Sequence, residues 1–227
     1  MKNICIIIPT FNNPNKIQEV VENALLLNVL VIVVDDFSPI KAREILTVHP
    51  NLSVLEHTES KGVIASILSG VEEAKKRMFD YSMVVDESKE LSIKALTDIY
   101  PLLDKKSIII EKRVFTTPVP FTMKLKQKSL SLLTWWVSGE WISDTNPSFI
   151  LYPISILNLD LSKNNYNNYI EIIIKHFWAN NRVKKIDIET YRLPQRVERS
   201  SYQSKSNHNT LLYSKLFIQN IMHWLTH

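Results

Sequence analysis

The stretch VLVIVVDDFS, residues 29–38, joins a continuous apolar run to two adjacent aspartates. An uninterrupted run of branched apolar residues is typical of a strand that is buried on both faces, as strands are in parallel sheets covered by helices. Asp35 and Asp36 follow at the end of this run. Adjacent carboxylates repel each other unless a cation or hydrogen-bond donors compensate. We therefore expect a buried parallel strand that brings polar side chains to one edge of a sheet.

The same arrangement repeats through the first half of the chain. Strand-like apolar runs occur at residues 4–9, 52–57, 81–86 and 107–111, and amphipathic helix-like segments occur at 13–27, 40–49, 61–78 and 92–103. Apolar strands that alternate with amphipathic helices predict an α/β domain, with a mostly parallel sheet flanked by helices on both faces.

The pattern changes beyond residue 112. Prolines come first, and a long helical pattern that contains Trp135, Trp136 and Trp141 follows. Residues 146–153 and 182–191 resemble short strands, residues 169–181 a helix, residues 192–209 a polar loop and residues 210–227 an amphipathic helix. We find no internal repeat and no low-complexity linker, so one domain over residues 1–227 is the simplest organisation.

Composition narrows the class of protein. The formal charge of +4 fits an anionic substrate or a membrane surface, and lysines on solvated faces explain it equally well. The single cysteine, Cys5, excludes an intrachain disulfide and a cysteine-based zinc cluster. It lies in an apolar run, so we expect a reduced core thiol and a cytoplasmic location. From the sequence we also expect no signal peptide and no membrane-spanning helix.

Three strand ends carry polar residues. They read PTFNN at residues 9–13, VVDDFS at 33–38 and VVDESKE at 84–90. In an open parallel sheet, ligands bind beyond the carboxyl ends of the strands, where these three stretches would meet. A single strand-end aspartate is equally compatible with a helix N-cap, so the combination carries more weight than any one of the three.

Four motifs resemble, in order and spacing, those of family two inverting glycosyltransferases with the GT-A fold. They are IIIPTFNN (6–13), VIVVDDFS (31–38), SKGVIASILSGVEEA (60–74) and YSMVVDESKE (81–90). The motifs are most similar to those of the dolichyl-phosphate-mannose-synthase-like transferases. Later segments at 108–120, 133–153 and 196–204 resemble one bacterial subgroup of these enzymes, usually encoded with enzymes of lipid or acyl-chain assembly. The resemblance implies a GT-A-like fold with a nucleotide-binding half (1–112), an acceptor half (113–206) and a C-terminal helix (207–227).

The resemblance also implies a nucleotide pocket. Pro9, Thr10 and Asn12 would line the base and ribose of a nucleoside-diphosphate sugar. Asp35 or Asp36 would contact the base. The same comparison places Lys61 near the nucleotide, where its ammonium could meet a phosphate.

A metal site is implied beside this pocket. Asp86 matches the first acid of the Asp-x-Asp motif, which holds Mg²⁺ or Mn²⁺ against the diphosphate. Ser88 stands where the second acid is usual, and Lys89 brings a positive charge beside the expected cation. A hydroxyl is a poor replacement for a carboxylate around these hard cations. Glu90 replaces a glutamine of the pattern and could partly compensate as a ligand.

Other positions depart from the pattern as well. Phe37 stands where the family usually has a glycine, so a bulky ring occupies a position of backbone freedom. Ser148 and Ile150 replace a glycine and an arginine near the acceptor side, which removes an expected anion contact. Asp144 matches an acid on that side, where it could be the general base for an acceptor hydroxyl. For a lipid phosphate acceptor no base is needed, and Asp144 would then only orient groups.

Two functions follow from these comparisons. One is an active, inverting glycosyltransferase with a weakened or relocated metal site, acting on a lipid-linked or acyl-type acceptor. The other is a catalytically inactive relative that binds or regulates a partner in lipid or glycan assembly. The expected partners are a nucleoside-diphosphate sugar and a lipid-type acceptor or a membrane surface, with no nucleic acid; the oligomeric state stays open. The expected location is the cytoplasm, with attachment to the inner face of the membrane as an alternative.

Two apolar features have alternative interpretations. Trp135, Trp136 and Trp141 could form a platform for an acceptor, but we expect at least two of them to pack in the core of one amphipathic helix. The apolar face of the C-terminal helix could lie in a membrane interface, and docking on the domain or on a second subunit is the preferred alternative.

Overall fold

The computed structural model describes residues 3–86, 98–115 and 149–159, residues 170–190, and single residues or short runs between 128 and 147 (128–129, 131–132, 134–136, 139, 141–142 and 147). Glu90, Asp144 and the expected C-terminal helix at 207–227 lie outside these described residues.

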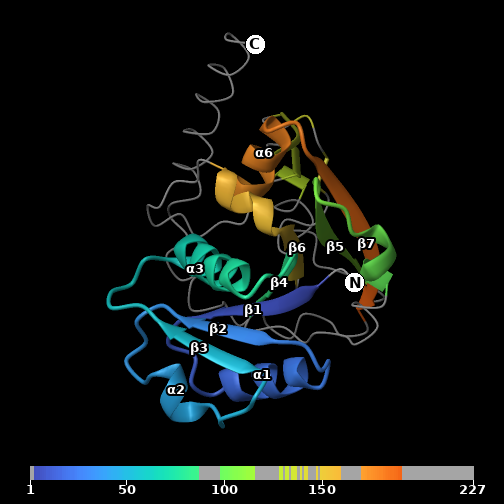
Figure 1. Ribbon diagram of the computed structural model, residues 1–227. Helices are drawn as coiled ribbons and strands as arrows, with labels where there is room; N and C mark the ends of the chain where they lie inside the picture. Colours follow the sequence, from blue (N-terminus) through green and yellow to red (C-terminus); the bar gives the residue numbers. More distant parts are fainter. Residues whose placement is uncertain are drawn as a thin grey trace.

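The described strands form one mixed sheet (Figure 1). Its order is β3-β2-β1-β4-β6-β5-β7. The strands are β1 (Ile4–Thr10), β2 (Val31–Asp35), β3 (Leu52–Glu56), β4 (Tyr81–Val85), β5 (Ser107–Phe115), β6 (Phe149–Pro153) and β7 (Arg182–Thr190). The predicted strands are therefore all present, with shifts of their ends.

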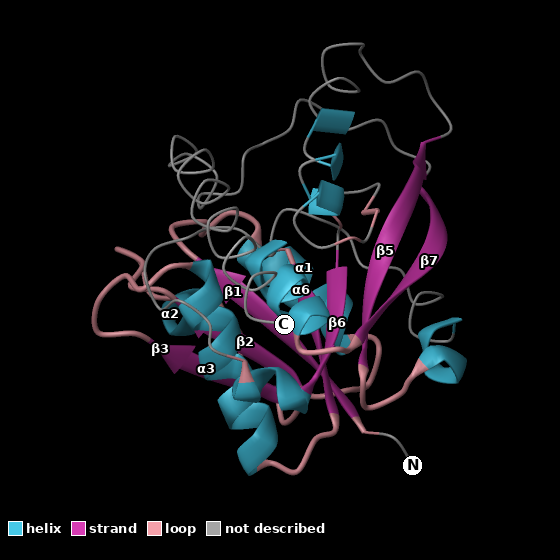
Figure 2. Ribbon diagram, turned by 90° about the horizontal axis from the view of Figure 1, so that it is seen from above, coloured by secondary structure: helices cyan, strands magenta, loops and turns pink. Residues whose placement is uncertain are grey.

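Strand direction divides the sheet into two parts. Strands β3, β2, β1 and β4 are parallel, which confirms the prediction made from their apolar runs. Strand β6 is antiparallel to both β4 and β5. Strands β5 and β7 are parallel again and run side by side beyond the rest of the sheet (Figure 2).

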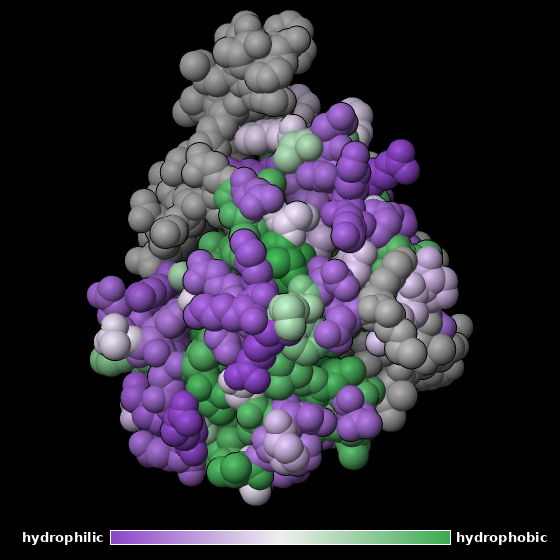
Figure 3. All heavy atoms as spheres, viewed as in Figure 1, coloured by the Kyte–Doolittle hydropathy of each residue, from purple (hydrophilic) through white to green (hydrophobic). Residues whose placement is uncertain are grey.

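Helices cover both faces of the sheet, as predicted. They are α1 (Ile17–Leu25), α2 (Ala42–Ile45), α3 (Val63–Lys76) and α6 (Ile170–Trp178), with 3-10 turns at η1 (Tyr100–Leu102) and η2 (Ile154–Asn158). In Figure 1, α1 and α2 lie on one side of the parallel strands and α3 and α6 lie on the other. The outward side of α3 is hydrophilic (Figure 3), as expected for a helix that buries only one stripe.

Alternate residues of β1 belong to two separate cores. Ile6 and Ile8 pack with α1, and Cys5 and Ile7 pack under α3. Cys5 is fully buried, and burial raises the pKa of its thiol to about 12, so the expected core thiol is confirmed. The approach of α3 to β1 is close, because a Cβ added to Gly70 would lie 2.6 Å from a methyl carbon of Ile7.

The tryptophan-containing segment differs from its prediction. Helical residues between 128 and 136 bury Ser131 and Thr134, whereas Trp135, Trp136 and Trp141 are 48%, 54% and 45% exposed. The expectation that at least two of these rings pack in the core is therefore wrong. The physical reason is the orientation of the helix, in which Ser131 and Thr134 face inward. No helix of the described residues is long and apolar enough to cross a bilayer.

Candidate functional site

The candidate site lies where β1 and β2 end at the same edge of the sheet. Thr10 of β1 pairs in register with Asp35 of β2, and the Asp36 N–H donates to the Thr10 carbonyl at 2.9 Å. Both aspartates are fully buried, and Thr10 is almost fully buried. The strand pairing therefore places two adjacent acids beside the residue predicted to line a nucleotide pocket.

Asp35 fixes the turn that leads from β2 into α2. Its Oδ1 accepts from the backbone N–H of Ser38 at 2.8 Å, and its Oδ2 accepts from the backbone N–H of Ala42 at 2.9 Å. The Ser38 hydroxyl in turn accepts from the backbone N–H of Asn12 at 2.9 Å. Asp35 thus ties the loop after β2 to the loop after β1.

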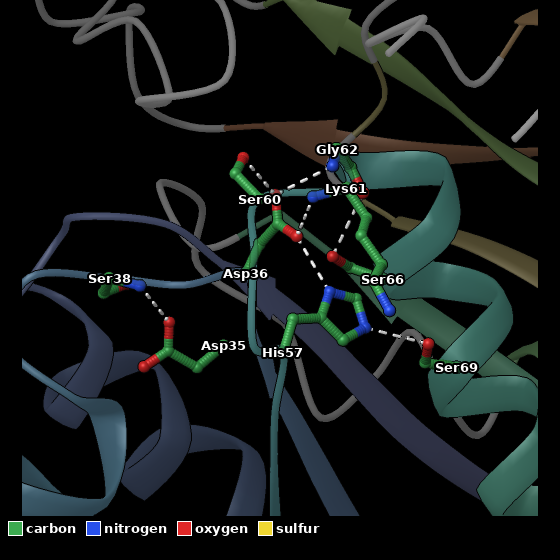
Figure 4. Close-up of polar contacts among 9 residues, drawn as sticks. All are labelled: Asp35, Asp36, Ser38, His57, Ser60, Lys61, Gly62, Ser66 and Ser69. Atoms are coloured by element: carbon green, nitrogen blue, oxygen red, sulfur yellow. Dashed lines mark hydrogen bonds and ion pairs between the residues drawn. The ribbon is translucent and has the colours of Figure 1, made fainter. Parts of the chain in front are cut away.

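Asp36 points away from Asp35 and holds a different loop (Figure 4). Its Oδ1 accepts from the Lys61 N–H at 2.8 Å, and its Oδ2 accepts from the Gly62 N–H at 2.9 Å. The Ser60 hydroxyl donates to Oδ2 at 3.0 Å, and His57 Nδ1 lies 2.8 Å from Oδ1. A carboxylate has about four acceptor positions, so the protein occupies all of those on Asp36.

Hydrogen-bond donors therefore compensate the two adjacent carboxylates. The sequence left open whether a cation or donors would do so, and these contacts decide for donors. An ionised carboxylate at 0% exposure is strongly destabilising unless it is fully hydrogen-bonded. The contacts consequently fix the loop at residues 57–62, which leads into α3.

His57 extends this network toward α3. Because a carboxylate only accepts, Nδ1 of His57 carries the proton that is shared with Asp36. Nε2 lies 2.9 Å from the Ser69 hydroxyl, which donates to it in the neutral ring. Sequence reasoning did not single out His57 or Ser69. The strand-end rule could have found His57, since this residue directly follows β3, the parallel neighbour of β2.

The backbone is unusual at two positions on this edge. Asn12 and Phe37 have φ of 52° and 67°, both in the left-handed region. Asparagine tolerates this region, whereas an aromatic residue is strained there. The expectation that Phe37 occupies a position of backbone freedom is consistent with this angle. Its ring is half exposed, and the Lys41 ammonium lies 4.6 Å from the ring centroid.

The remaining predicted residues lie on or near the same edge. Pro9 is buried in β1 and Asn12 is exposed just beyond it. Asp86 directly follows β4, the other parallel neighbour of β1, and is 6% exposed. The backbone of Lys61 is fixed by Asp36, whereas its side chain is exposed.

The predicted metal ligands are described only in part. Asp86 is placed at the sheet edge, but Glu90 and the predicted base Asp144 lie outside the described residues. Within the part of the chain that the structure describes, no three His, Cys, Asp or Glu side chains form a group that could hold a metal ion. Of the predicted metal ligands, the structure therefore describes Asp86, a buried carboxylate directly after β4.

A family model gives an independent view of this chain. The model described as "Glycosyl transferase family 2" matches residues 5–182, which include β2 to β6, all of β1 except Ile4, and the first residue of β7. No functionally curated protein matches the chain at a significant level.

Solved structures share the fold at low sequence identity. Glucosyl-3-phosphoglycerate synthase from Mycobacterium tuberculosis, crystallised with Mn²⁺, uridine diphosphate and glucosyl-3-phosphoglycerate, is 13% identical with a TM-score of 0.65, over 93% of this chain and 80% of that one. Mannosyl-3-phosphoglycerate synthase from Rubrobacter xylanophilus is 10% identical with a TM-score of 0.62, over 96% and 72%. Residues 1–349 of TarS from S. aureus are 17% identical with a TM-score of 0.54, over 81% of this chain and 58% of that fragment. At these identities the likeness establishes the fold.

Proposed function

Because this chain belongs to glycosyl transferase family 2, we propose that it transfers a sugar from a nucleoside-diphosphate sugar to a lipid-linked or acyl-type acceptor, with inversion at the sugar carbon. The observation that carries the proposal is the meeting of Thr10, the loop held by Asp36 and Asp86 at one edge of the sheet. Ligands of open α/β sheets bind at this edge.

The proposed nucleotide pocket uses Pro9, Thr10 and Asn12 beside the base and ribose. Of the two aspartates, we assign contact with the base to Asp35. It accepts two hydrogen bonds from the protein, whereas Asp36 accepts from four donors. A carboxylate offers about four acceptor positions, so among the contacts of the described residues Asp35, and not Asp36, keeps capacity for an N–H of the base.

The proposed diphosphate site uses Lys61, Asp86 and a divalent cation. Mg²⁺ is commonly held by one or two carboxylates together with phosphate oxygens, so a site with Asp86 as its main carboxylate fits this chemistry. Glu90 is proposed as an additional ligand. When bound, Mg²⁺ or Mn²⁺ would stabilise the charge that develops on the leaving diphosphate. The exposed ammonium of Lys61 would meet a phosphate, while Asp36 keeps the backbone of Lys61 in place.

On the acceptor side, Asp144 is proposed to remove the proton from an acceptor hydroxyl. For an acceptor phosphate, which is already ionised, the same residue would only orient the attacking oxygen. The proposed location is the cytoplasm, where a free cysteine such as Cys5 stays reduced, at the inner face of the membrane.

Nucleotide binding tests the donor half of the proposal. Calorimetry with UDP and GDP, with and without Mn²⁺, should show metal-dependent binding of one nucleotide. Asp86→Ala should abolish the metal dependence. Asp80→Ala is the matched control, because Asp80 is an exposed acid at the opposite end of β4 and should leave binding unchanged. Absence of binding by either nucleotide would instead favour the inactive binding partner.

A transfer assay tests the acceptor. The wild-type chain is incubated with radiolabelled nucleotide sugars and either a polyprenyl phosphate or a small water-soluble hydroxy acid phosphate. Label that enters the organic phase supports a lipid-linked acceptor, and label confined to a water-soluble product contradicts it. The anomeric configuration of the product, measured by NMR, decides between inversion and retention.

A further inference from the structure

The helical residues between 128 and 136 bury two hydroxyl side chains and expose large apolar ones. Ser131 and Thr134 are 2% and 0% exposed, whereas Leu132, Trp135 and Trp136 are each about half exposed. Positions 132, 135 and 136 are separated by three and four residues, so they share one face of the helix. A helix packed on a core in water normally shows the reverse arrangement, and this exposed apolar face therefore needs an explanation other than core packing.

Trp141 adds a fourth large apolar residue. It is 45% exposed, and its carbonyl oxygen accepts a hydrogen bond from the ammonium of Lys185, an exposed residue of the edge strand β7. Lys128 is also exposed, at the start of the helical residues. We refer to Leu132, Trp135, Trp136 and Trp141 as the tryptophan surface.

The sequence around this surface is strongly basic. Residues 112–139 contain no Asp or Glu, although acids make up 23 of the 227 residues of the chain. The same stretch contains five cations: Lys112, Arg113, Lys124, Lys126 and Lys128. Three of these lysines immediately precede or begin the helical residues. Positive charge is thus concentrated in the sequence next to the exposed apolar face.

We propose that the tryptophan surface docks on an anionic lipid bilayer. Tryptophan rings prefer the headgroup region, where one side of the ring is apolar and its N–H meets polar groups. An exposed lysine at such a face, as Lys128 is here, is attracted by anionic headgroups, and Lys124 and Lys126 precede it in the sequence. The inference rests on the proposed function for its purpose, because a lipid-linked acceptor would lie in the bilayer on which the chain docks.

A carbohydrate platform would explain the rings but not the charges. Neutral sugars stack on one or two aromatic faces, so they give no role to a 28-residue stretch with five cations and no acid. An anionic bilayer uses both features at once. We therefore favour the bilayer, and the sugar platform becomes an outcome of the test.

The first experiment is sedimentation of the full chain with vesicles, without a sugar donor. The vesicles contain phosphatidylcholine alone or mixed with phosphatidylglycerol. The wild-type chain should bind the anionic vesicles, bind phosphatidylcholine at least about tenfold more weakly, and dissociate as salt is raised. Tryptophan emission should shift to shorter wavelength on binding. Failure to bind, or equal binding to both vesicles, overturns the proposal.

Two variants test the two components of the surface. The double variant Trp135→Ser with Trp136→Ser should bind anionic vesicles at least about tenfold more weakly. Its matched control is Val48→Ser with Met78→Ser, which removes two exposed apolar side chains elsewhere (97% and 85% exposed). The triple variant Lys124→Gln, Lys126→Gln, Lys128→Gln should lose the preference for anionic vesicles. Its control, Lys75→Gln with Lys76→Gln, removes cations from the end of α3 and should keep it.

The remaining outcomes separate this inference from its competitors. If the tryptophan variant binds as well as wild type and a chain ending at Asn209 does not, the docking surface is the C-terminal segment and the inference fails. If oligosaccharides quench the tryptophan emission and vesicles have no effect, the surface is a sugar platform. Nucleotide calorimetry on the tryptophan variant should match wild type, which shows that the variant is folded. If the chain binds vesicles but binds no nucleotide, this inference holds and the proposed function is wrong.

Discussion

Buried polar groups have different roles in the parallel half of the sheet and in the helical residues between 128 and 136. In the parallel half, Asp36 is fully buried, and its oxygens hold the loop before α3. In the helical segment, small hydroxyl residues are buried and tryptophans are exposed. Buried polar side chains therefore have two different effects in this molecule. In the first region they fix a loop, and in the second their burial leaves the apolar side chains of the helix exposed.

The largest effect is expected from Asp36→Ala. This change leaves the buried N–H of Gly62 and the partly buried N–H of Lys61 without their acceptor and should lower the free energy of unfolding by about 3–5 kcal/mol. Asp35→Ala removes an acceptor from only two N–H groups and should cost about 2 kcal/mol. Urea denaturation measures both, with Asp80→Ala as a surface control. Equal losses for the two aspartates would contradict the distinction between them.

The next effect is expected where α3 meets β1. Gly70→Ala places a methyl group 2.6 Å from Ile7 Cγ2 and should destabilise the chain by about 1–3 kcal/mol, despite the better helix propensity of alanine. A double-mutant cycle with Ile7→Ala checks the cause. The alanine at position 70 should cost much less in the Ile7→Ala background, and additive losses would show that the close approach is not responsible.

A smaller effect of opposite sign is expected from Phe37→Gly. Glycine adopts the observed φ of 67° without strain, and this gain should exceed the entropy lost by the flexible chain, giving about 0.5–1 kcal/mol of added stability. Asn12→Gly is the matched control, since asparagine already tolerates the left-handed region and should gain less. A loss of stability in Phe37→Gly would mean that the contact of its ring with Lys41 outweighs the strain.

The smallest effect concerns Asp104, in the other half of the sheet. Burial opposes ionisation of Asp104, but hydrogen bonds from Lys184, Ser107 and the Lys106 N–H outweigh it and lower the pKa to about 2. A lowered pKa in the folded state means that the ionised carboxyl stabilises the fold at pH above its ordinary value of 3.8. This contribution should disappear as the pH falls from 3.8 to 2. Because both side chains are partly exposed, we expect less than about 1 kcal/mol.

Denaturation of Asp104→Asn at several pH values checks this prediction. The variant should be less stable than wild type near neutral pH, and the two should converge near pH 2. A constant difference over that range would show that the ion pair with Lys184 does not set the pH dependence.

The sequence predicted the strands and helices of the parallel half because each strand is an uninterrupted apolar run. It also predicted that polar side chains would meet at the carboxyl ends of β1, β2 and β4. It could not predict which donors in the loop before α3 surround Asp36, since Ser60, Lys61 and Gly62 are brought to Asp36 only by the fold. The exposure of Trp135 and Trp136 was also not predictable, because helical periodicity does not reveal which face turns inward.

The pairing of strand β6 is unequal on its two sides. It pairs with β4 from Tyr81 to Val85, but in the described strands it pairs with β5 only at Ile109 and Ile110. The long pair of strands β5 and β7 is therefore joined to the rest of the sheet by a short stretch of pairing between β5 and β6. Native-state hydrogen exchange should show two cooperative units, with the amides of β5 and β7 exchanging together and before those of β1 and β4. Opening of the β5–β6 pairing would move β5 and β7 without disturbing the loop that Asp36 holds.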